Sequence, residues 1–118
     1  MRRSIIVTTV IATLALPTSA KSFTEEQTSV IDRVVQAIVA GTNGNCPRLL
    51  TIDKEIVQEL LTAGIAPDQQ IDTIDEVFST STQIVRARYA SNPNDFCKEA
   101  WRLVGPLGSH KRQLLKAN

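Results

Sequence analysis

The residues of this chain that are able to do chemistry are few: two cysteines, one histidine and a set of carboxylates. Cys46 and Cys97 enclose 50 residues, and neither belongs to a Cys-x-x-Cys motif. In an oxidising compartment such a pair is usually a disulfide, and the alternatives are a reactive thiol or a metal ligand. We expect the Cys46–Cys97 disulfide, because the single histidine, His110, lies near the C-terminus and no zinc-ligand spacing is present.

The carboxylates indicate a charged surface rather than a catalytic pair. Asp68, Asp72 and Asp75 step by four and three residues, which places them along one face of a helix. Such a row could hold a cation, but calcium takes about six or more oxygens from a folded loop, so a solvated face is favoured. Glu55 and Glu59 have no partner acid in a different environment, as a glycosidase needs. With one histidine a hydrolase triad is also disfavoured, so we expect no enzyme, metal or cofactor.

The N-terminus has the three zones of an export signal. A charged start, Met1-Arg2-Arg3, precedes an apolar run over residues 5–16 and a small-residue exit, Pro17-Thr18-Ser19-Ala20. The run is too short for a membrane-spanning helix, which needs about 20 apolar residues, although an uncleaved anchor is the alternative. We therefore expect a signal peptide over residues 1–20, a periplasmic or secreted protein, and no stable membrane anchor after cleavage.

Charge excludes one class of partner. Without Arg2 and Arg3, the 13 basic residues become eleven, against twelve acidic ones. A nucleic-acid-binding protein normally presents a strongly basic face, and aromatic residues for base stacking are also scarce here. We expect a protein partner and no nucleic acid.

The charge is unevenly divided along the chain. Residues 25–76 carry ten acids and three bases, whereas residues 77–118 carry seven bases and two acids. This asymmetry predicts either a docking face for a charged partner or two halves that pack together and cancel. Trp101 could line a groove, although a core position is favoured. The candidate partner-binding residues are Asp68, Asp72, Asp75, Trp101, Lys111, Arg112 and Lys116.

Hydrophobic periodicity predicts an all-α domain, a small bundle of about four helices with no strand pair. Thr24 and Gln27 form a capping-box pattern at the start of the first helix. Ser79–Thr82 is poor helix material and allows a kink in the third helix, and residues 51–53 allow a break in the second. The expected helices span residues 25–40, 45–64, 67–90 and 92–104.

These boundaries divide the chain into three parts. We expect a signal peptide over residues 1–20, a helical disulfide-bonded domain over residues 21–108, and a basic C-terminal tail over residues 109–118. The tail surrounds Leu114 and Leu115 with basic residues, which predicts either a short docked helix or a mobile segment.

The motif Phe96-Cys97-Lys98-Glu99-Ala100-Trp101-Arg102-Leu103-Val104-Gly105-Pro106, with Cys46-Pro47 upstream, resembles a signature of small exported helical proteins of alphaproteobacteria. That resemblance implies export and a disulfide between the two cysteines, without an activity. The architecture is also similar to that of periplasmic acid-stress chaperones, from which no residue carries over.

Together these features predict a non-enzymatic protein-binding or stress-related protein of the bacterial periplasm. The alternative is an effector delivered into host cells, because type IV secretion signals are often C-terminal and basic. A small enzyme is the third hypothesis.

Overall fold

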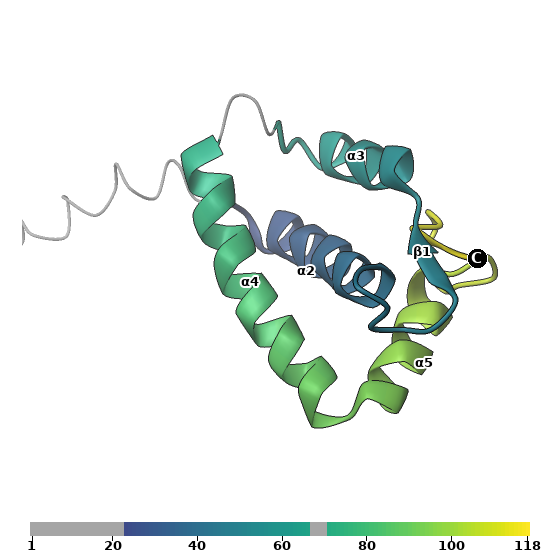
Figure 1. Cartoon of the computed structure of the whole chain (residues 1–118). Helices are drawn as coiled ribbons and strands as arrows, with labels where there is room; N and C mark the ends of the chain where they lie inside the picture. Colours follow the sequence, from purple (N-terminus) through teal and green to yellow (C-terminus); the bar gives the residue numbers. More distant parts are fainter. Residues whose placement is uncertain (1–22, 67–70) are drawn as a thin grey trace, which may run out of the picture.

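Four helices and two short strands make up the part of the chain that the structure, a computed structural model, describes: residues 23–66 and 71–118, with the backbone alone for residues 71–73. The expected signal peptide, residues 1–20, lies outside it. The central helix α2 packs against α3, α4, α5 and β1 (Figure 1). The elements are α2 (Glu25–Gly41), β1 (Leu49–Thr51), α3 (Asp53–Thr62), α4 (Ile71–Ser91), α5 (Pro93–Val104) and β2 (Leu115–Ala117).

Helix α2 forms where the sequence predicts it. The Thr24 side chain accepts a hydrogen bond from the backbone N–H of Gln27, and the Gln27 side chain accepts one from the backbone N–H of Thr24. This capping box satisfies two donors that the first helical turn leaves unpaired. The predicted apolar stripe is buried at Val30, Ile31, Val34 and Val35.

A two-stranded antiparallel sheet replaces part of the expected second helix. β1 pairs with β2 so that Leu50 lies opposite Lys116. Arg48, with φ of 69°, interrupts the helical conformation expected there, and α3 begins only at Asp53. The prediction of no strand pair is therefore wrong, because a three-residue strand is too short to show a period and its partner lies far along the chain.

The last ten residues belong to the same core as the helices. Leu114 and Leu115 are both 0% exposed. The backbone N–H of Leu114 donates to Val104 O, and that of Ile52 donates to Leu114 O. Residues 109–118 therefore form neither the docked helix nor the mobile tail that the sequence predicts, because burial of the two leucines holds the segment on the core and pairing with β1 makes Leu115–Ala117 a strand.

Helix α4 is continuous through Ser79–Thr82, where the sequence allows a kink. Ser81 is buried, and its hydroxyl donates to Asp32 Oδ1 of α2 at 2.7 Å. The residue that weakens helix propensity thus supplies a hydrogen bond between two helices. Tertiary contacts override local preference at this point.

Helix α5 begins at the Asn92 cap with Pro93 in its first turn, as predicted. It buries Phe96, Ala100 and Val104, whereas Trp101 is 36% exposed. The core position favoured for Trp101 is therefore wrong. Trp101 directly follows the buried Ala100 on the helix, so its side chain lies on the flank of the buried stripe.

The predicted disulfide is confirmed. Cys46 and Cys97 are bonded, with their Cα atoms 5.5 Å apart. Cys46 lies in the loop between α2 and β1, so the bond ties α5 to that loop and not to the start of a helix.

Among the described residues, no helix is long and apolar enough to cross a membrane, and no group of three or more histidines, cysteines or acids could hold a metal ion.

Gly41 allows the end of α2 to lie directly against β1. A Cβ atom there would lie 2.8 Å from both Cγ2 and the backbone N of Thr51. Alanine has the higher helix propensity by about 1 kcal/mol, but overpacking against a backbone costs about 1–3 kcal/mol. We expect Gly41→Ala to lower the free energy of unfolding, measured by denaturant titration. A variant as stable as the wild type would show that β1 does not pack this closely.

Candidate functional site

A cleft among the described residues opens between three segments: the first turns of α2, one side of α3 and the loop over residues 110–113. Its volume is about 890 Å³. Pockets for small ligands have volumes of roughly 300–1,000 Å³, so this cleft is large enough for a ligand or a partner's side chains.

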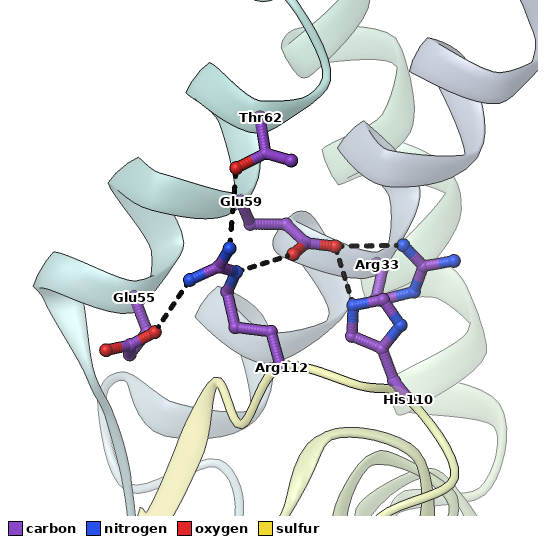
Figure 2. Close-up of polar contacts among 6 residues, drawn as sticks. All are labelled: Arg33, Glu55, Glu59, Thr62, His110 and Arg112. Atoms are coloured by element: carbon purple, nitrogen blue, oxygen red, sulfur yellow. Dashed lines mark hydrogen bonds and ion pairs between the residues drawn. The ribbon is translucent and has the colours of Figure 1, made fainter.

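A buried carboxylate lies in the wall of this cleft. The side chain of Glu59, on α3, is 9% exposed. Figure 2 shows Arg33, His110 and Arg112 all pointing at its carboxylate. Arg33 Nη1 donates to Oε2 at 3.1 Å, Arg112 Nε donates to Oε1 at 3.0 Å, and His110 Nε2 lies 2.6 Å from Oε2. The carboxylate is thus compensated from two sides, which a buried charge requires.

Arg112 spans the surface of α3 with its whole guanidinium group. In addition to the bond with Glu59, Nη1 donates to Glu55 Oε1 at 3.0 Å and Nη2 donates to Thr62 Oγ1 at 3.4 Å. The hydrogen bond that Arg112 donates to Glu55 raises the pKa of the Arg112 side chain, desolvation opposes this, and the hydrogen bond to Glu59 raises the pKa further. Arg112 therefore stays charged and holds the C-terminal segment on α3.

Local structure explains why these side chains meet. Glu55, Glu59 and Thr62 are spaced by four and three residues, so they share one face of α3. His110 and Arg112 are two residues apart in a non-helical segment, and both point toward α3 (Figure 2). The backbone N–H of His110 donates to Leu103 O and that of Leu114 to Val104 O, which fixes the segment against α5.

The arrangement favours recognition of charged groups over proton transfer. The Glu59 carboxylate already contacts three side chains, so its oxygens are not free to take a proton from a substrate. Arg33 makes one hydrogen bond through Nη1, and Lys111 is exposed without an ion pair among the described residues. Both line the cleft, as does the exposed Glu26. Spare hydrogen-bond donors of Arg33 and Lys111 and the carboxylate of Glu26 are thus available to a partner. They lie beside the Glu59 clamp, by which we mean the contacts of the Glu59 carboxylate with Arg33, His110 and Arg112.

The structure does not bring the predicted partner-binding residues into one site. Lys111 and Arg112 line the cleft. Lys116 lies on β2 and Trp101 on α5, both outside the cleft. Asp75 is exposed on α4, the side chain of Asp72 is not described, and Asp68 lies outside the described residues.

The packing of the two halves accounts for part of the charge asymmetry. His110 and Arg112, from the basic half, contact Glu55 and Glu59, from the acidic half. This contact supports the interpretation that the halves fold together and cancel. Arg33, Glu59 and His110 were not predicted as a site. The spacing of Glu55 and Glu59 is a usable signal, but Arg33 is 26 residues from Glu59, and His110 and Arg112 are more than 50 residues from it.

Comparison with protein-family models, curated proteins and solved structures finds no match to this chain. The resemblance to small exported helical proteins of alphaproteobacteria therefore stays a prediction.

Glu59→Gln tests the clamp. The variant leaves Arg33 and Arg112 facing an amide in place of a shared carboxylate, so we expect a loss of about 2 kcal/mol in the free energy of unfolding. Amide exchange over residues 110–117 should accelerate, because this segment loses its tie to α3.

Glu55→Gln is the matched control on the same helix face. Glu55 is 29% exposed and binds only Arg112, so its replacement should cost less than about 1 kcal/mol. Equal losses in the two variants would contradict a central role for Glu59.

Proposed function

We propose that this chain is an exported, non-catalytic protein of the bacterial periplasm that binds another protein through the cleft between α2, α3 and residues 110–113. The proposal combines the export signal expected from the sequence with the charged cleft of the structure. The disulfide supports it, because such bonds persist in oxidising compartments.

The observation that carries the proposal is that two cationic side chains at the cleft keep unused hydrogen-bond donors: Arg33 binds Glu59 through Nη1 alone, and Lys111 forms no ion pair with the described residues. Arg33 and Lys111 come from different segments and reach the same cleft. Charged groups at an interface set the orientation of the partner and the association rate more than the affinity. A partner that presents acidic side chains fits these two residues.

The effector hypothesis depends on a free basic segment at the C-terminus. In the structure, Arg112 is held by three side chains and β2 is paired with β1. A C-terminal signal that is read as a free extended segment would require this strand to separate from β1. The geometry therefore favours binding through the folded domain.

A photoreactive residue in place of Ser29 tests the proposal in the native organism. Ser29 is exposed and lines the cleft. We expect an adduct of one defined mass in the envelope fraction, on a protein that lacks its first 20 residues. The same photoreactive residue at Gln83, exposed on α4 and outside the cleft, should give no such adduct.

Two lysine variants separate the cleft from general basicity. Lys111→Ala should reduce the Ser29 adduct, whereas Lys116→Ala, which removes an exposed lysine from β2, should not. Cross-linking that is equal at positions 29 and 83, or equally reduced by both variants, would contradict binding in the cleft.

A further inference from the structure

A second hollow lies between α2 and α4, at a different place from the cleft of the proposed function. Its volume is about 170 Å³. The apolar part of its lining comes from Val35, Ile38 and Val39 of α2 and from Phe78 of α4. Val35 and Val39 are buried, whereas Ile38 and Phe78 are partly exposed.

The size and lining of this hollow suit a small apolar group. An apolar cavity of roughly 150 Å³ in a protein core stays dry and binds a ligand with the bulk of benzene. Side chains that border an empty space lose dispersion contacts, and an apolar ligand restores them. The groove is open to solvent beside Ile38 and Phe78, but its volume is sufficient for about six carbon atoms.

Two polar side chains at the same groove have no side-chain partner within the part of the chain that the structure describes. Thr42 and Asn45 also line it, but the Thr42 hydroxyl donates to Ile38 O and the Asn45 amide donates to Val39 O. In residues 23–66 and 71–118, by contrast, the Thr82 hydroxyl makes no side-chain hydrogen bond and the Arg86 guanidinium forms no ion pair.

Thr82 and Arg86 are four residues apart on α4, so they follow one another along the same face of the helix. Arg86 is exposed and is the last residue along α4 that lines the groove. A guanidinium group binds a carboxylate through two parallel N–H donors, and a neighbouring hydroxyl can donate a third hydrogen bond. The groove thus offers an apolar slot that leads to a binding position for an anion.

We propose that the groove between α2 and α4 binds a small amphiphilic carboxylate, with an alkyl chain of about six carbons against Val35, Val39 and Phe78 and its carboxylate on Arg86 and Thr82. This site is independent of the protein-binding cleft. It does not require that the chain be exported.

Titration of the purified oxidised protein with hexanoate, followed by the backbone amide signals in NMR, tests the proposal. We expect saturable shifts centred on Val39, Thr82 and Arg86, and smaller effects with 1-hexanol, which lacks the charge. Hexylamine, which carries the opposite charge, should give the weakest binding. No saturable shift with hexanoate, or equal binding of hexylamine, would overturn the proposal.

Arg86→Gln should weaken hexanoate binding about tenfold, since it removes a charged hydrogen-bond partner. Arg88→Gln is the matched control, because Arg88 is exposed on the same helix and lies over the Phe96 ring rather than at the groove. Shifts that are equally weakened in both variants, or that centre on Ser29 and Lys111 of the cleft, would place the ligand elsewhere and overturn the assignment.

Discussion

The carboxylate of Glu59 connects the first, middle and last parts of the described chain, and the cleft depends on this connection. Arg33 comes from α2, and His110 and Arg112 come from the C-terminal segment. A buried carboxylate is costly unless donors surround it, so the three side chains are needed as a group. In meeting this need, they position the loop that forms one wall of the cleft.

Two further links between distant parts of the chain stabilise the same region as the Glu59 clamp. The Cys46–Cys97 bond ties α5 to the loop after α2, and β2 pairs with β1 directly before α3. Each joins segments from opposite halves of the sequence around α2. The C-terminal residues therefore contribute to the core through Leu114 and Leu115 and to the cleft through His110, Lys111 and Arg112.

The sequence predicted those features that depend on local patterns. The capping box at Thr24, the buried stripe of α2 and the Asn92 cap of α5 follow from the residues within each helix. The strand pair and the contacts of Glu59 could not be predicted in this way, because the paired residues lie 26 (Arg33 and Glu59) to more than 50 residues apart. Three-residue strands also carry too little periodicity, and the leucines at 114 and 115 fit a helix equally well.

Truncation of the chain after Gly108 tests most directly the claim that the C-terminal segment completes the fold. The variant keeps the residues of the four helices and both cysteines but loses two fully buried leucines, β2 and two of the side chains that contact Glu59. Loss of buried leucines costs about 2–5 kcal/mol each, which is comparable to the stability of a small domain. We expect no cooperative thermal transition and poorly dispersed amide signals. A truncated protein that unfolds cooperatively near the wild-type temperature would contradict the account.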